Sequence, residues 1–203
     1  MKLYDGGRAP NPRRVRMFLA EKGIEVPMVP VDMAKGEHWS PEIARLNPLK
    51  RLPILELDDG SILTESMAIC RYFEALHPEP NLFGEDPVEI AMIEMWNRRA
   101  EFELYTAVQA VFRHGHPGMA KAEPRQIAEW ADLNRDRVIE ALQLLDDRLA
   151  KTEYLAGARF SVADITAFVS IELMKAIKTS VPEEMASLRR WHAAMLERPS
   201  AKA

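Results

Sequence analysis

The chain has 203 residues, a net charge of −4 at neutral pH, 47% apolar residues and 29% charged residues. A chain of this length and balance forms one large domain or two small ones around a sizeable core. Lys and Arg are spread along the sequence, so no basic patch indicates binding to nucleic acid or to an anionic membrane. No apolar run approaches the ~20 residues that a membrane-spanning helix needs.

Cysteine and histidine usage narrows the class of protein further. Cys70 is the single cysteine, which excludes an internal disulfide. The five histidines lack the spacing of metal ligands, so we expect no metal site. Residues 1–7 are too short and polar a start for a secretory signal peptide. Together these features predict a cytoplasmic protein.

Strand and helix signals alternate through the first 76 residues. The predicted elements are, in order, a strand at 2–4, a helix that starts near Pro10 and Pro12 and ends at Gly23, a strand at 26–31, a short helix from Ser40 to before Pro48, a hairpin of strands at 54–57 and 61–63, and a helix at 65–76. Asp59-Gly60 supplies the positive φ that the tight hairpin turn needs. This order predicts an α/β domain, a four-stranded mixed sheet with helices on both faces.

The second half of the chain carries helix signals alone. Residues 77–84 read as a Pro-rich and Gly-containing linker. Helices are predicted at 87–114, 124–150, 162–177 and 185–197, the second with Val138, Leu142, Leu145 and Leu149 on one face. Ser161 and Asp164 form a capping box at the start of the third. We therefore predict two domains, 1–78 and an all-helical domain at 86–203.

A proline at the entrance of a predicted strand indicates a place for a peptide ligand. Pro53 cannot donate a hydrogen bond to the sheet. If the Leu52–Pro53 bond is cis, the amide and carbonyl of Leu52 turn out of the sheet, and an extended peptide could pair with them as an added strand. The alternative is a trans proline at the edge of the sheet, and the local sequence does not decide between the two.

Glu65-Ser66 lies where a loop becomes a helix, a position that attracts carboxylates through free backbone N–H groups and the helix dipole. The Ser66 hydroxyl adds a donor and the Glu65 carboxylate could hold an ammonium, so a zwitterionic amino-acid end would fit here. The alternative is ordinary capping by Thr64 and Ser66. Three basic residues in nearby loops could meet a second carboxylate or simply be solvated: His38, Lys50 and Arg51.

Four short motifs in this order resemble the glutathione-binding domain of cytosolic glutathione transferases. They are Lys-Gly-Glu-His at 35–38, Asn-Pro-Leu-Lys at 47–50, Leu-Pro-Ile-Leu at 52–55 and Glu-Ser-Met-Ala-Ile at 65–69. Phe160–Ile165 resembles the capping motif in the helical domain of the same family. The resemblance covers essentially the whole chain and implies a thioredoxin-like first domain.

The resemblance also implies roles for individual residues. Pro53 would be cis, and Leu52 would pair with the cysteinyl backbone of glutathione. Glu65 and Ser66 would hold the γ-glutamyl end. The glycyl carboxylate would lie near two basic residues, His38 and Lys50. The helical domain would supply the pocket for an electrophile, with Tyr105 among its candidates, and the protein would be a homodimer.

The chain departs from the family pattern at the group that activates the thiol. A free thiol has a pKa near 8.5, and lowering it by about two units takes about 2.7 kcal/mol of preferential thiolate stabilisation. The family usually supplies a Tyr, Ser or Cys near the end of the first strand, but none occurs between residues 5 and 38. Tyr4 lies one residue early and would face the other side of the sheet, which favours a packing role. Residues 9–16 resemble an atypical branch, known from bacteria and fungi, that lacks the hydroxyl.

In a fungal member of that branch, the activating group is thought to be a water, held by a Ser and a His on the first long helix of the helical domain. Gln109 and Arg113 occupy the matching positions here. His114 could hold or deprotonate a water, and Arg113 could stabilise the thiolate by its charge. The N-terminus of the first helix, with the Asn11 amide and Arg13, is a further candidate that needs no hydroxyl. Alternatively, His114 and His116 simply end their helix, where cationic residues favour the dipole.

The predicted function is conjugation of the glutathione thiol to a small hydrophobic electrophile, a detoxification reaction. Two alternatives stay open: a non-catalytic glutathione-binding protein, and a glutathione-dependent reductase that works through a mixed disulfide at Cys70. A buried cysteine more often behaves as a small hydrophobic residue. The sequence does not name the electrophile.

Overall fold

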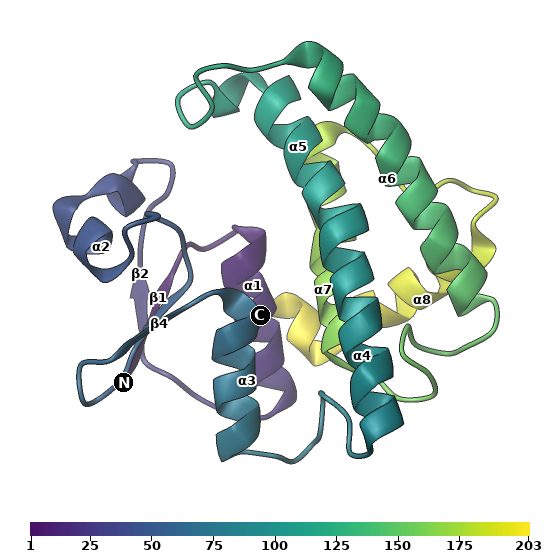
Figure 1. Cartoon of the computed structure of the whole chain (residues 1–203), viewed down its shortest axis with the longest axis horizontal. Helices are drawn as coiled ribbons and strands as arrows, with labels where there is room; N and C mark the ends of the chain where they lie inside the picture. The colour runs from purple at the N-terminus through teal and green to yellow at the C-terminus, as the bar shows by residue number, and fades with distance from the viewer. The chain divides into compact units, whose positions relative to one another are not determined.

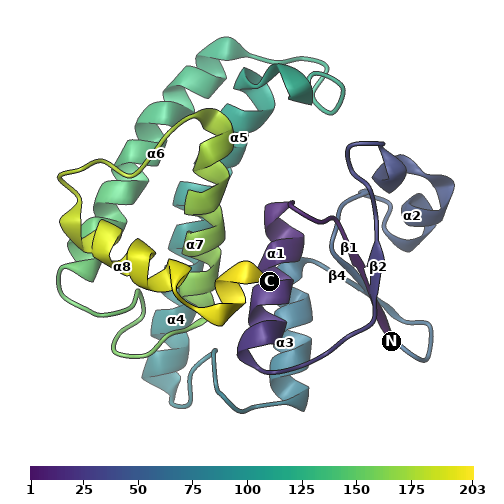
Figure 2. The same cartoon turned by 180° about the vertical axis from the view of Figure 1, so that it is seen from behind.

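A computed structural model describes all 203 residues. The chain divides into two compact units, residues 1–81 together with 199–203, and residues 82–198 (Figures 1 and 2). No helix combines the length and the apolar character that crossing a membrane requires.

The first unit is built on a four-stranded mixed sheet with the strand order β2-β1-β3-β4. Its strands are β1 (Lys2–Asp5), β2 (Met28–Pro30), β3 (Ile54–Glu56) and β4 (Ile62–Thr64). β1 runs parallel to β2 and antiparallel to β3, and β4 completes the predicted hairpin. The predicted thioredoxin-like sheet is confirmed, although β2 is shorter than the predicted strand at 26–31.

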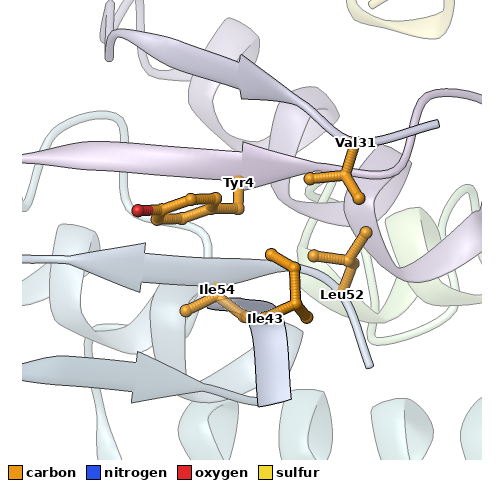
Figure 3. Packing of buried hydrophobic residues seen from close by; sticks show 5 residues of the cluster. All are labelled: Tyr4, Val31, Ile43, Leu52 and Ile54. Carbon is orange, nitrogen blue, oxygen red and sulfur yellow. The ribbon is translucent and has the colours of Figure 1, made fainter. Parts of the chain in front are cut away.

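Helices cover both faces of this sheet. α1 (Pro10–Glu21) and α3 (Ser66–Leu76) lie on one face, and α2 (Pro41–Leu46) lies on the other, after the short 3-10 helix η1 (Glu37–Trp39) (Figures 1 and 2). Side chains alternate between the faces of a strand. The α2 face therefore has its own core cluster, which consists of Tyr4, Val31, Ile43, Leu52 and Ile54 (Figure 3).

Tyr4 packs in this cluster, as the one-residue offset predicts. Its side chain is 4% exposed, and its hydroxyl donates to Oε2 of Glu56 at 2.9 Å. Figure 3 shows the hydroxyl at the end of the cluster away from Leu52 and Val31. Burial raises the pKa of Tyr4. The tyrosine is therefore held as a neutral structural group.

Two segments beyond the sheet contact α1 and the residue that follows it. In the expected linker, the carbonyls of His77 and Pro80 accept from Nζ of Lys22 at 2.6 and 2.8 Å. The 3-10 helix η5 (Pro199–Lys202) returns at the end of the chain, where Nη2 of Arg13 donates to the carbonyl of Ala201 at 2.7 Å. Residues 199–203 thereby belong to the first unit.

The second unit is all-helical, as predicted. Its elements are α4 (Pro87–Arg99), the π-helix η2 (Ala100–Tyr105), α5 (Thr106–Gly115), the 3-10 helix η3 (Pro117–Met119), α6 (Ala128–Leu149), α7 (Val162–Leu173), the 3-10 helix η4 (Met174–Ile177) and α8 (Ala186–Leu196). The predicted helix at 87–114 therefore contains a π-helical stretch, at whose end the Thr106 amide donates to the carbonyl of Glu101, five residues back.

α7 forms the centre of the second unit, since every residue from Val162 to Ile171 is buried. The predicted capping box is present, with the Ser161 amide donating to Oδ2 of Asp164 at 3.0 Å. Oδ1 of Asp164 accepts from the Leu155 amide and from Nε1 of Trp191, each at 3.0 Å. One buried carboxylate thus joins α7 to the preceding loop and to α8. Burial raises the pKa of Asp164 to about 6.

Candidate active site

A small pocket in the first unit brings together residues from three separate segments. Its volume is about 40 Å³. A pocket of this size holds one end of a ligand, such as an amino-acid head group, rather than a whole drug-sized molecule. The lining residues are Asn11, Asn47, Arg51, Leu52, Pro53, Glu65 and Ser66. Five of the predicted site residues are therefore neighbours: Asn11, Leu52, Pro53, Glu65 and Ser66.

Leu52 offers unpaired backbone groups at this pocket. The Leu52–Pro53 bond is cis, and β3 begins only at Ile54. The Leu52 amide and carbonyl make no hydrogen bond within the chain, while the side chain is 6% exposed and packs in the α2-face cluster. The residue is thus anchored by its side chain and keeps a donor and an acceptor for an extended peptide.

Asn47 supports the loop that leads into Leu52. Its Nδ2 donates to the carbonyl of Arg51 at 2.8 Å, and its Oδ1 accepts from the Leu49 amide at 3.0 Å. The side chain is 4% exposed. The sequence analysis did not single this residue out, although an Asn that bonds the backbone two residues on is a recognisable loop signal.

Glu65 has an unusual backbone conformation at the start of α3. Its φ is 65° and its ψ is 117°, in a region that non-glycine residues occupy at a cost of about 1–3 kcal/mol. No side chain caps the N-terminus of α3, so the alternative of ordinary capping by Thr64 and Ser66 is not observed. Ser66 is 5% exposed. The helix thus begins with open backbone groups beside a strained acidic residue.

Arg14 lies beneath this corner and was not predicted as a site residue. It is fully buried, and its Nη1 donates to Oγ of Ser66 at 3.1 Å. The helical spacing could have revealed it, because Arg14 shares a face of α1 with Asn11, Val15 and Phe18.

The first turn of α1 has few free backbone N–H donors. Pro10 and Pro12 have no N–H, and the Ala9 amide donates to the carbonyl of Gly6 at 3.3 Å. The Asn11 amide is therefore the one open donor of this turn. Oδ1 of Asn11 is buried and has no hydrogen-bond partner. Asn11 can thus offer a donor and an acceptor to a ligand in the pocket.

Close packing beside this turn requires a glycine. A Cβ at Gly6 would lie 2.9 Å from Sδ of Met33 and 3.1 Å from Cδ1 of Leu52. A side chain at this position would therefore require the side chains of Met33 and Leu52 to shift.

His38 and Lys50 lie outside the pocket lining. His38 belongs to η1, is 8% exposed, and has its ring centroid 4.4 Å from that of Trp39. Lys50 is exposed and has a φ of 53°. These two predicted residues occupy the loops that precede and follow α2.

The candidates in the helical unit have partners of their own. Nε of Arg113 donates to Oε2 of Glu123 at 2.9 Å. Nδ1 of His114 accepts from the Ile127 amide at 3.2 Å, so the neutral ring carries its proton on Nε2. Tyr105 ends the π-helix, is 8% exposed, and its hydroxyl accepts from Nε2 of Gln109 at 3.4 Å.

Cys70 is poorly suited to thiol chemistry. Its side chain is fully buried in α3, and burial raises the pKa of its thiol to about 12. A thiol in this state forms almost no thiolate near neutral pH.

A second pocket lies wholly within the helical unit, with a volume of about 430 Å³ between the C-terminal end of α7, η4 and α8. His192 and Glu172 pair across its wall, with Nε2 of the ring 3.1 Å from the Glu172 carboxylate. Burial lowers the pKa of His192 against the opposing effect of Glu172. No group of three or more His, Cys, Asp or Glu side chains in the structure could hold a metal ion.

Comparisons with known proteins agree with this architecture. The family model for the glutathione S-transferase N-terminal domain matches residues 1–75, and a C-terminal domain model matches residues 128–194. Glutathione S-transferase 2 of Saccharomyces cerevisiae is 40% identical over 205 residues, which cover 100% of this chain and 88% of the yeast protein. The chain belongs to the glutathione S-transferase family. The family and the enzyme class predicted from the sequence, a glutathione transferase, are thereby confirmed.

Solved structures of glutathione transferases show the same fold. The crystal structure of Gtt2 from Saccharomyces cerevisiae superposes with a TM-score of 0.94 and covers 100% of this chain and 99% of its own. A Gtt2-class transferase from Vibrio parahaemolyticus, 34% identical, gives a TM-score of 0.88 over 100% of this chain and 96% of its own. Both units of the chain therefore have counterparts in known glutathione transferases.

Proposed function

We propose that this glutathione transferase adds the thiol of glutathione to a small hydrophobic electrophile. The observation that carries the proposal is the pocket that joins Leu52 to Glu65 and Ser66. These residues come from different segments, and together they offer backbone pairing groups, a carboxylate and a hydroxyl. That set matches a peptide with a zwitterionic end.

Glutathione would be bound from both of its ends. Glu65 would hold the γ-glutamyl ammonium, while Ser66 and the open start of α3 would hold the neighbouring carboxylate. The backbone of Leu52 would pair with the cysteinyl residue. His38 and Lys50 would lie near the glycyl carboxylate, and Lys50 would contribute positive charge.

We place Asn11 first among the candidates for thiol activation. Its open backbone N–H at the start of α1 would donate to the sulfur, and the helix dipole favours the negative charge there. The thiol would lose its proton to solvent. The sulfur would then form a bond to an electrophilic carbon. In a substitution the bond to the leaving group would break and its electron pair would depart with that group; in an addition to an unsaturated carbonyl compound the π-electron pair would shift toward the carbonyl and take up a proton from solvent.

Arg113 and His114 come second because both already have structural partners. Glu123 pairs with Arg113, and Ile127 occupies Nδ1 of His114. Nε2 of His114 would hold a water as a donor rather than deprotonate it. For the electrophile, we propose a pocket contributed by the helical unit with Tyr105 in its wall.

We propose a cytoplasmic homodimer as the working form. Dimerisation is typical of the family, and the helical unit exposes large apolar side chains, with Val88 72% and Phe102 59% exposed. Such residues are common in subunit interfaces. Sedimentation equilibrium tests this assignment, since a monomer at every concentration contradicts it.

The binding site is tested by calorimetric titration with glutathione. Ser66→Ala should weaken binding about tenfold or more because it removes a hydrogen bond to a charged group. Ser61→Ala, in the hairpin turn of the same unit, is the matched control and should bind as the parent does. Unchanged affinity in Ser66→Ala would remove the γ-glutamyl assignment.

The reaction itself is tested by turnover. Ultraviolet titration of bound glutathione should give a thiol pKa below 8.5, and a panel of aryl halides and unsaturated carbonyl compounds should yield conjugates. Cys70→Ala should leave turnover unchanged, because Cys70 is buried and unreactive. Loss of turnover in this variant would favour the mixed-disulfide reductase, and tight binding without turnover would favour a binding protein.

A further inference from the structure

Arg14 is a charged side chain in the interior of the first unit, at the back of the proposed glutathione site. It is fully buried, and its Nη1 lies 3.1 Å from Oγ of Ser66, which is itself 5% exposed. Burying a guanidinium is costly, so a retained one needs a compensating interaction. The contact with Ser66 connects this buried charge directly to the wall of the pocket.

The contact fixes which way the Ser66 hydroxyl can act. A hydroxyl has one hydrogen to donate and lone pairs to accept, whereas a guanidinium has donors alone. Ser66 must therefore accept from Arg14, and its own hydrogen is left for another acceptor. Since Ser66 lines the pocket, this corner offers a donor to the ligand. It favours a carboxylate over an ammonium.

The charge of Arg14 acts in the same direction. A guanidinium stays protonated at every physiological pH, and a buried charge is screened less by water and salt than an exposed one. Its field already reaches α3, where it lowers the pKa of Cys70 against the larger opposite effect of burial. A carboxylate bound at Ser66 would experience the same field.

We propose that Arg14 is a positioning residue that makes the Ser66 corner selective for the free α-carboxylate of a γ-glutamyl peptide. It does so by holding the Ser66 hydroxyl as a donor and by placing a positive charge behind it. The inference rests on the proposed function, because the γ-glutamyl end must bind at Ser66 for Arg14 to select it.

The test compares two ligands by calorimetry. One is glutathione, and the other is γ-aminobutyryl-cysteinyl-glycine, which lacks only the α-carboxylate of the glutamyl residue. The parent protein should prefer glutathione. Arg14→Met should lose about tenfold or more of that preference through weaker glutathione binding, while affinity for the analogue stays nearly the same.

Arg16→Met is the matched control. Arg16 lies on the same helix and pairs with Asp5 rather than with Ser66. Its loss should lower stability without changing the preference. Arg14→Lys keeps the charge and should restore part of the preference. In a Ser66→Ala background, Arg14→Met should cost much less of the preference than in the parent.

The possible outcomes distinguish failure of the role proposed for Arg14 from failure of the proposed glutathione binding at Ser66. A parent protein with no preference between the two ligands overturns the γ-glutamyl assignment itself. A parent with a clear preference that Arg14→Met retains overturns the role of Arg14 alone. Equal weakening of both ligands shows a merely structural residue and also overturns it. Should Arg14→Met fail to fold by circular dichroism, Arg14→Gln carries the same comparison.

Discussion

Helices α1 and α3 of the first unit begin differently from helices α4 and α7 of the helical unit. In the helical unit, α7 starts with the Ser161–Asp164 capping box, and the Asp86 side chain accepts from two amides at the start of α4. In the first unit, α1 and α3 start without any side-chain cap. Where a side chain of the protein accepts from the backbone N–H groups of the first turn, the helix end contributes to stability. Where the chain leaves the turn open beside a pocket, the groups remain free for a ligand.

The largest expected effect is on the free energy of unfolding, when the capping residue of α7 is removed. Asp164→Ala leaves the amides of Leu155 and Ser161 and the indole N–H of Trp191 without their acceptor. Because each buried unsatisfied donor costs about 1–3 kcal/mol, we expect a loss of about 3 kcal/mol or more in the free energy of unfolding. Asp86→Ala, at the exposed cap of α4, should cost only about 1 kcal/mol. Urea denaturation measures both, and equal losses would remove the distinction between the two caps.

Asn11 tests the open helix end at α1. Asn11→Pro removes the last open amide of the first turn, whereas Asn11→Ala keeps it. We expect the pKa of bound glutathione to be about one unit higher in the proline variant than in the alanine variant. Ultraviolet titration of the thiolate measures the difference. Identical values in the two variants would exclude the backbone donor from thiol activation.

Glu65→Gly, at the uncapped start of α3, should change protein stability and glutathione binding in opposite directions. Glycine tolerates a φ of 65°, so the substitution should stabilise the protein by about 1 kcal/mol while glutathione binding weakens. Glu65→Ala removes the carboxylate but keeps the backbone strain, so it should weaken binding without that gain. Thermal unfolding and calorimetry check both variants. A less stable glycine variant would contradict the assignment of strain.

Substitution of His192 should have the smallest effect, which is a change in how the free energy of unfolding depends on pH. The folded pKa of His192 is lowered from 6.5 by burial, so the unfolded chain takes up a proton first as the pH falls. The stability it contributes is complete above pH 6.5 and is lost as the pH falls below that value. Asp164, with its pKa raised to about 6, acts in the opposite direction in the same range. The difference in unfolding free energy between the parent and His192→Gln therefore isolates the histidine, and a difference independent of pH would contradict the assignment.

The sequence by itself determined the order of the elements, because prolines, glycines and apolar spacing act within a few residues of each other. Pro10, Gly23 and Asp59-Gly60 mark element ends that the structure reproduces within a few residues. The Ser161–Asp164 box was readable for the same reason, and the short motifs around Pro53 and Glu65 indicated the family.

Only the tertiary structure decided how these local pieces meet. No local signal announces that Arg14 reaches Ser66, that the α3 end lacks a cap, or that residues 199–203 return to α1. Nor did the apolar spacing of 87–114 reveal the π-helix at 100–105. Contacts between distant segments depend on which side chains the folded backbone brings together. A local sequence pattern does not identify the distant segment that will pack against it.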